Sequence, residues 1–277
     1  MTCFETVRDG ELLLASQNVP DADFDAKQLF MHAAGMDQTA YALQKDCVPG
    51  ETVSARFRSL LERRIAGEPL QYILGEWDFC GNRFYVGEGV LIPRPETEEL
   101  TQFCIESVLS HGYRTVYDLC AGSGCIGISI AAACKQTQVY LVERYDAAIG
   151  YMQKNIPAEF KRRLHVVRRD VFTGPDPELP APELLVSNPP YIPSAELCSL
   201  QTEVQREPAT ALDGGIDGLD FYRAIASRWL PVVCAGGMLA FECGETQAMK
   251  IASLFAPAKT QIKKDIYGAD RFVVAEK

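Results

Sequence analysis

The sequence predicts an α/β fold built on a doubly wound, mostly parallel sheet and preceded by a small helical region. From Thr115 onward, short apolar strands alternate with helical segments, the order that a parallel sheet covered on both faces requires. The apolar run Leu184–Val186 is typical of a strand buried on both faces. Residues 1–75 instead carry their apolar side chains at helical spacing.

The helical region is expected to form a domain over residues 1–75. Apolar residues recur at helical spacing over 29–34 and 55–65, and proline and glycine residues separate the segments. Four arginines gather in the last segment and form either a solvated helix face or a docking face for a protein partner: Arg56, Arg58, Arg63 and Arg64.

Residues 76–92 are predicted to be a β-hairpin that links two domains, because aromatic residues flank the turn pair Gly81-Asn82. Acidic residues then follow Pro95, and acidic side chains in a first turn favour a helix, here running to about Ser110. The large domain is expected to span 93–277.

The remaining elements follow in alternation, with a proline-rich surface loop over 175–182. Strands are predicted at 115–119, 139–143, 164–168, 184–187, 238–242, 261–264 and 271–275. Helices are predicted at 126–134, 147–155, 217–229 and 246–255.

Composition argues against several classes of protein. The net charge of −10 would repel a phosphate backbone, so nucleic acid is a poor partner. The chain has no run of 18 apolar residues and no secretory signal at Met1–Gly10, so no membrane segment is expected. Its ten cysteines lack metal-ligand spacing, which predicts reduced thiols in a cytoplasmic protein without a metal site. We also expect a monomer.

An unusual corner follows the apolar run at 184–186. Asn188 is followed by Pro189, Pro190 and Tyr191, and the prolines stiffen the backbone and end the strand ladder. The corner would present an amide side chain, a free carbonyl and an aromatic face at the sheet edge where α/β proteins bind ligands. Two acceptors beside a flat ring suit a planar –NH2 group. The alternative is a strand-ending turn without chemistry.

Other strand ends predict a nucleoside-containing cofactor. Asp118 precedes a loop containing Gly122 and Gly124, and an anionic carboxylate there would favour a ligand that bears an ammonium group. Glu143 ends the next strand and could accept both hydroxyls of a ribose, and Asp170 could meet an adenine edge. S-adenosylmethionine has these three parts.

Together with further segments of the sequence, these motifs make the chain similar to the release factor glutamine methyltransferases of the HemK type over nearly its whole length. The resemblance rests on five segments: 91–98, 118–124, 188–192, 207–215 and 268–272. It implies a Rossmann-like, S-adenosylmethionine-dependent methyltransferase domain and an N-terminal domain that docks the substrate. It also implies methylation of the side-chain nitrogen, N5, of the glutamine in the Gly-Gly-Gln loop of peptide chain release factors.

The resemblance assigns roles residue by residue. Its cofactor contacts fall on Cys120, Ala121, Gly122, Ser123, Gly124, Glu143, Val171 and Asn188, beside Asp118 and Asp170 from the strand-end pattern. Its substrate contacts fall on Asn188, Pro189, Pro190 and Tyr191, of which Asn188, Pro189 and Tyr191 are the candidate catalytic residues. The chain departs from the family at Cys120-Ala121, where Gly-Thr is common, at Glu143, where Asp is usual, and at Val171, where some members carry an aromatic residue.

Three other functions are alternatives to this one. An amino-methyltransferase acting on adenine or cytosine would use the same tetrapeptide on a flipped base, but the acidic balance disfavours it. A catalytically silent adaptor would not need the glycine loop or Asn188. A nicotinamide dehydrogenase would need a third glycine, which the spacing after Gly124 lacks.

Overall fold

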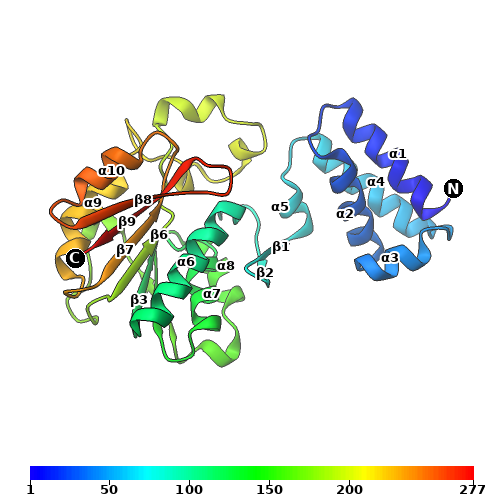
Figure 1. The fold of residues 1–277 in the computed structure, drawn as a ribbon. Helices are drawn as coiled ribbons and strands as arrows, with labels where there is room; N and C mark the ends of the chain where they lie inside the picture. The colour runs from blue at the N-terminus through cyan, green and yellow to red at the C-terminus, as the bar shows by residue number, and fades with distance from the viewer. The chain divides into compact units, whose positions relative to one another are not determined.

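The computed structural model describes residues 1–277, and the chain divides into two compact units. The first unit comprises Met1–Glu76 with the short segment Gln201–Arg206, and the second comprises Trp77–Leu200 with Glu207–Lys277. The first unit is helical, as Figure 1 shows. Its helices are α1 (Cys3–Ser16), α2 (Ala22–Ala34), α3 (Gln38–Gln44), α4 (Glu51–Ile65) and α5 (Leu70–Leu74).

Local sequence signals set the limits of these helices. Thr2 accepts a hydrogen bond from the Glu5 amide, and the Glu5 carboxylate accepts one from the Thr2 amide, so α1 begins with a reciprocal capping box. Gly35 ends α2 in the left-handed conformation that glycine adopts without strain. Between the helices, the rings of Phe30 and Phe57 pack edge to face at 5.4 Å between centroids.

The four arginines of α4 do not act as one cluster. The side chain of Arg64 is only 3% exposed, and its guanidinium lies 2.6 Å from both the Asp25 and the Glu203 carboxylates. Arg63 pairs with Glu68, and Arg56 lies 3.3 Å from a ring nitrogen of His32. Arg64 is therefore an internal cross-link of the first unit rather than part of a solvated or docking face, and the docking role of this unit stays a prediction.

The second unit contains the predicted sheet. A hairpin precedes it, formed by β1 (Glu76–Phe79) and β2 (Asn82–Tyr85), whose buried Phe79 and Phe84 join the core of this unit. The strands of the sheet are β3 (Thr115–Leu119), β4 (Gln138–Glu143), β5 (Leu164–Arg168), β6 (Leu184–Ser187), β7 (Met238–Glu242), β8 (Lys259–Lys264) and β9 (Asp270–Glu276). Its helices are α6 (Pro95–His111), α7 (Cys125–Ala133), α8 (Asp146–Asn155), α9 (Asp220–Ala224) and α10 (Ala248–Leu254).

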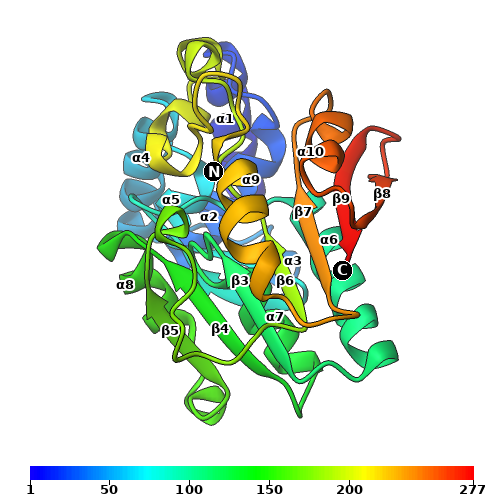
Figure 2. The same cartoon turned by 90° about the vertical axis from the view of Figure 1, so that its left-hand side faces the viewer.

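The strand order is β5-β4-β3-β6-β7-β9-β8, which Figure 2 shows from left to right. The first five strands are parallel, and β9 runs antiparallel to both β7 and β8. Alternate residues of β3 and β6 point to opposite faces, so Val116 and Val186 pack under α6 and α7 while Tyr117 and Leu185 pack under α9 and α10. The predicted α/β fold with a mostly parallel, doubly wound sheet is confirmed.

One predicted helix differs from the structure. The segment predicted as a single helix over 217–229 begins at Asp220 and changes at Ile225 into a π-helical turn that reaches Trp229. The indole nitrogen of Trp229 donates a hydrogen bond to the Val171 carbonyl at 2.8 Å, and this buried contact accompanies the wider turn. None of the helices in the chain is long and apolar enough to cross a membrane.

The buried ion pair of the first unit gives a stability prediction. Arg64→Ala should lower the free energy of unfolding by about 3–5 kcal/mol, because it leaves the buried Asp25 carboxylate without its partner. Urea unfolding followed by circular dichroism would measure this loss. Arg58→Ala is the matched control, since Arg58 is exposed and lies on the same helix. Equal losses in the two variants would contradict the assigned role of Arg64.

Candidate active site

A cleft lies at the carboxyl ends of the parallel strands in the second unit. Its wall includes Cys120 and Gly122 after β3, residues 143–145 at the end of β4, residues 169–172 after β5, and Asn188 and Pro190 after β6. Other residues also line it: Gly89, Val90, Leu91, Val142, Ala148, Pro208, Thr210, Ala211 and Phe221. The cleft occupies the edge at which open α/β sheets bind ligands.

The loop between β3 and α7 turns sharply to reach this cleft. Cys120 has a φ of 57° and Gly122 a φ of 55°, both in the left-handed region. Gly122 has no Cβ and adopts this backbone without steric strain, whereas L residues such as Cys120 adopt it rarely. The Gly124 amide closes the turn by donating to the Ala121 carbonyl at 2.7 Å. The loop thereby places Cys120 and Gly122 at the cleft wall.

Asp118 lies beneath this loop rather than on the cleft wall. Its carboxylate is fully buried; Oδ2 accepts a hydrogen bond from the Gly127 amide at 2.9 Å, and Oδ1 has no partner. Burial raises the pKa of Asp118 to about 7, although the Gly127 hydrogen bond lowers it. Asp118 therefore supports the start of α7, and the expected direct contact with a ligand ammonium group stays a prediction.

Glu143 is held in one orientation by backbone amides. The residue is buried, one carboxylate oxygen accepts from the Gly122 amide at 3.0 Å, and the other accepts from the Arg144 and Tyr145 amides at 2.6 and 2.9 Å. It is thus not the solvent-facing charge that a single acidic residue at a strand end suggests. A carboxylate fixed in this way keeps acceptor capacity for the hydroxyl groups of a ligand at the cleft wall.

Aromatic side chains line the cleft beyond Asp170. The Asp170 carboxylate accepts from the Phe172 amide at 2.9 Å and pairs with Arg144 at 2.7 Å. Val171 is buried, but Phe172 and Phe221 both line the cleft and pack edge to face at 4.9 Å. The flat surface absent at position 171 is therefore provided by other residues. Sequence reasoning missed Phe221 because it comes from α9, fifty positions away from Val171.

Asn188 stands where the ladder of β6 ends. The strand pairing stops at Ser187, whose hydroxyl donates to the Leu119 carbonyl at 2.6 Å and so joins the ends of β6 and β3. Asn188 is half-buried and reaches the cleft wall, and its Nδ2 donates to the Thr97 hydroxyl at 3.1 Å. Pro189 and Pro190 are both buried, and Pro190 also lines the cleft.

The backbone around Tyr191 is held by the segment 212–218. The Ile192 amide donates to the Leu212 carbonyl at 3.0 Å, and the Gly214 amide donates to the Ile192 carbonyl at 2.8 Å. A Cβ on Gly218, whose φ is +73°, would lie 2.2 Å from the Tyr191 carbonyl oxygen. The close approach requires glycine at this position, and Gln247 also donates to the same carbonyl at 2.8 Å. The half-buried Tyr191 ring packs against the core beneath α9 and α10.

Glu207 joins two of the segments on which the family resemblance rests, 91–98 and 207–215. The buried Glu207 carboxylate accepts a hydrogen bond from the Ile92 amide at 2.9 Å and pairs with Arg94. This contact fixes the backbone that leads into α6. Thr97 at the start of α6 is thereby held at the position from which it meets Asn188.

Comparison with known proteins identifies the family. A family model described as "PrmC N-terminal domain" matches residues 5–75, and one described as "Methyltransferase small domain" matches residues 94–213. The relative from Geobacter sulfurreducens is 38% identical, with 88% of this chain and 84% of the relative covered, and the one from Cereibacter sphaeroides is 35% identical, with 99% and 98% covered. Both carry the name release factor glutamine methyltransferase. The chain belongs to this family.

Membership of the release factor glutamine methyltransferases makes the chain a methyltransferase enzyme. A relative of the same name from Thermodesulfovibrio yellowstonii is 33% identical, with 91% of this chain and 92% of that one covered. Among solved structures, the hMettl16 catalytic domain in complex with the MAT2A 3′UTR hairpin 6 superposes with a TM-score of 0.55 at 15% identity, over 76% of this chain and 80% of that one. This likeness supports the fold.

The cleft gathers about half of the site residues expected from the sequence. Those on its wall are Cys120, Gly122, Glu143, Asp170, Val171, Asn188 and Pro190. The others do not line it: Asp118, Ala121, Ser123, Gly124, Pro189 and Tyr191. Arg144, Tyr145, Phe172 and Phe221 line the cleft without having been expected, and no short motif marks them in the sequence.

The contact between Gly218 and Tyr191 gives a prediction for activity. Gly218→Ala should lower methyl transfer by about 10²-fold, because the new Cβ pushes the Tyr191 carbonyl and shifts the corner at Asn188. Steady-state turnover would measure the effect. Gly112→Ala is the matched control, since its φ is also near +70° but its Cβ would meet open space. If both variants kept normal turnover, the corner would not depend on this packing.

Burial of Asp118 gives a prediction for pH dependence. The folded-state pKa of about 7 exceeds the ordinary value of 3.8, so the contribution of Asp118 to stability is greatest below pH 4 and is lost as pH rises through 7. Asp118→Asn removes this titration. The free energy of unfolding of the wild type relative to Asp118→Asn should therefore fall between pH 4 and pH 7 in urea titrations. A difference that stays constant with pH would contradict the buried, elevated pKa.

Proposed function

We propose that this enzyme transfers a methyl group from S-adenosylmethionine to the side-chain amide nitrogen, N5, of the glutamine in the Gly-Gly-Gln motif of peptide chain release factors. Family membership supports glutamine methylation of release factors, and the family and fold imply S-adenosylmethionine as the methyl donor. The observation that carries the finer proposal is Asn188, which reaches the cleft wall with its Nδ2 already bonded to Thr97 and its Oδ1 left to accept.

The cleft residues fit S-adenosylmethionine by their chemistry. The fixed carboxylate of Glu143 suits a ribose diol, and Asp170 with the rings of Phe172 and Phe221 suits an adenine. The amino-acid part of the cofactor is assigned to the region of the cleft beside Cys120 and Gly122, whose backbone is left-handed. When bound, the cofactor supplies an electrophilic methyl group on a sulfonium centre.

The corner after β6 suits a carboxamide substrate. An amide nitrogen is a weak nucleophile because its lone pair is delocalised, so the main task of the enzyme is alignment, worth about 7–11 kcal/mol in favourable cases. In the proposed reaction, Asn188 Oδ1 and the Pro189 carbonyl accept the two hydrogens of the glutamine amide and orient its nitrogen. Tyr191 stacks on the amide plane and helps to exclude water.

The same two acceptors stabilise the charge that develops during transfer. As the nitrogen takes up the methyl group it becomes positive, and oxygen dipoles fixed in advance favour that charge without reorganisation. Because methylation makes the nitrogen proton acidic, the proton can leave to water and the reaction needs no side-chain base. The first unit is proposed to dock the body of the release factor.

Mass spectrometry tests the proposed substrate. Purified release factor would be incubated with the full-length enzyme and S-adenosylmethionine, digested, and its Gly-Gly-Gln peptide fragmented. A mass gain of one methyl group on the glutamine side chain is expected. A methyl group on another residue would contradict the proposal, as would transfer to duplex DNA or RNA under the same conditions without modification of the release factor.

Removal of the Asn188 acceptor tests the positioning mechanism. Asn188→Ala should lower kcat by about 10²-fold or more, as loss of a preorganised polar group does in other enzymes. Single-turnover rates at saturating cofactor would separate this loss from weaker cofactor binding. Asn82→Ala is a control, since Asn82 is the exposed first residue of β2 and its Nδ2 donates only to the Cys80 carbonyl of the adjoining turn. Near-normal turnover by Asn188→Ala would show that alignment does not depend on its amide.

A further inference from the structure

A chain of hydrogen bonds links Asn188 to a buried carboxylate through a threonine. Asn188 Nδ2 donates to Thr97 Oγ1 at 3.1 Å, and Thr97 Oγ1 donates to Glu242 Oε2 at 2.6 Å. The three residues come from the loop after β6, the first turn of α6 and the carboxyl end of β7. Thr97 is 3% exposed and Glu242 is 2% exposed, so water does not compete for these bonds.

The chemistry of the three groups gives this chain of bonds one direction. At a pH above the Glu242 pKa, its ionised carboxylate can only accept, so the Thr97 hydroxyl proton then points to Glu242. The hydroxyl oxygen then has only lone pairs to offer Asn188, and it takes the –NH2 end of the amide. The opposite end of the amide, Oδ1, is left for the cleft.

We infer that Thr97 and Glu242 are positioning residues that set the orientation of the Asn188 side-chain amide and so present Oδ1, not Nδ2, to the substrate glutamine. This inference rests on the proposed function. With the amide reversed, the –NH2 group of Asn188 would face the –NH2 group of the substrate, and two donors cannot share a hydrogen bond. A rotation of 180° about one side-chain bond would thus convert the acceptor into a blocking group.

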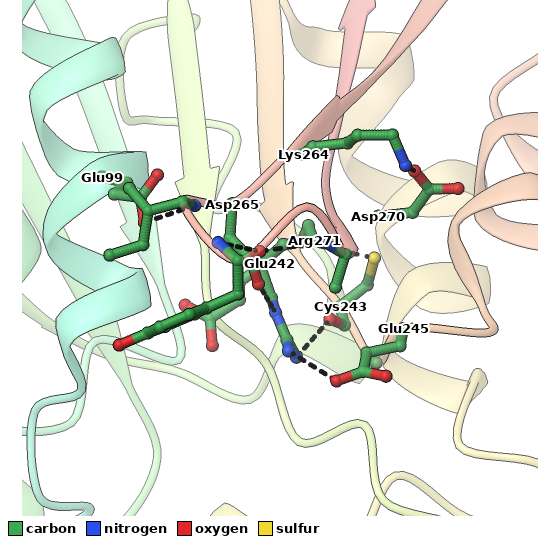
Figure 3. A network of polar contacts seen from close by, with 12 residues as sticks. Glu99, Glu242, Cys243, Glu245, Lys264, Asp265, Asp270 and Arg271 are labelled. Carbon is green, nitrogen blue, oxygen red and sulfur yellow. Dashed lines mark hydrogen bonds and ion pairs between the residues drawn. The ribbon is translucent and has the colours of Figure 1, made fainter.

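The surroundings of Glu242 keep its carboxylate in place. Arg271 of β9 lies beside Glu242 in Figure 3, and its guanidinium donates to Asp265, Glu245 and the Cys243 carbonyl. Tyr222 of α9 donates its hydroxyl hydrogen to the Glu242 main-chain carbonyl at 2.7 Å. Burial raises the pKa of Glu242 to about 7, while the Thr97 hydroxyl and Arg271 lower it.

The segment at 265–271 builds this support. The buried Asp265 carboxylate accepts from the Tyr267 and Ala269 amides, each at 3.0 Å, and from Arg271 at 3.2 Å. Lys264 pairs with Asp270 across the same turn at 2.7 Å. The turn between β8 and β9 therefore fixes Arg271 next to Glu242, although none of these residues lines the cleft.

Two substitutions at position 97 test the inference. Thr97→Val keeps the shape of the side chain and removes the hydroxyl, and it should lower kcat at least about tenfold, the equivalent of one lost buried hydrogen bond. The KM for release factor and the calorimetric Kd for S-adenosylmethionine should stay within about threefold of wild type, since Thr97 does not line the cleft. Thr97→Ser restores the hydroxyl and should recover most of the lost turnover.

Thr101→Val provides the matched control. Thr101 is a fully buried threonine one turn further along α6, and its hydroxyl donates only to the Thr97 main-chain carbonyl at 2.8 Å. Its substitution should cost stability comparable to that of Thr97→Val and leave kcat unchanged. An equal loss of kcat in both variants would reduce Thr97 to a structural part of α6 and overturn the inference.

A double variant separates a relay from independent packing effects. Glu242→Leu removes the side-chain acceptor and should lower kcat alone, but it should add little in the background of Thr97→Val, because the link to Asn188 is already broken. Additive losses would overturn the inference, as would a Thr97→Val enzyme with wild-type kcat. A wild-type enzyme that leaves release factor unmodified would instead contradict the proposed function itself.

Discussion

The geometry of the site depends on the abrupt end of β6. Up to Ser187 the strand is locked into the sheet by β3 and β7 on either side. Two consecutive prolines then remove the amide hydrogens that would continue the ladder, so the chain must leave the sheet at its carboxyl edge. Asn188 directly follows the last residue paired in the sheet, Ser187, and lines the cleft. A flexible loop could not hold an amide group there with comparable precision.

Elements with a strong local signal could be predicted from the sequence. β3 and β6 have the predicted limits, because continuous apolar runs bounded by turn residues leave few alternatives. The segment after Asp217 was predicted less well, because a π-helical turn is not encoded by a periodic pattern. The turn is instead associated with packing of Trp229 against residues some sixty positions earlier.

Site residues could be predicted from the sequence where an acidic residue ends or closely follows a predicted strand. Glu143 and Asp170 are such cases, and both line the cleft. The orientation of a side chain was harder to predict. Asp118 has a suitable charge, but its carboxylate points to α7 beneath the loop and does not line the cleft. Partners distant in the sequence were not predictable at all. Thr97 falls in segment 91–98, but the sequence assigns it no role, and only the fold brings it to Asn188 and Glu242.

The two compact units are not consecutive pieces of sequence, because Gln201–Arg206 returns to the first unit before the chain re-enters the second. Glu203 on that excursion is one of the two carboxylates that neutralise Arg64. An excised fragment ending near residue 76 would therefore lack a native counter-ion as well as the rest of the enzyme. Genetic exchange of N-terminal units between family members would have to carry this distant hexapeptide along to preserve charge balance.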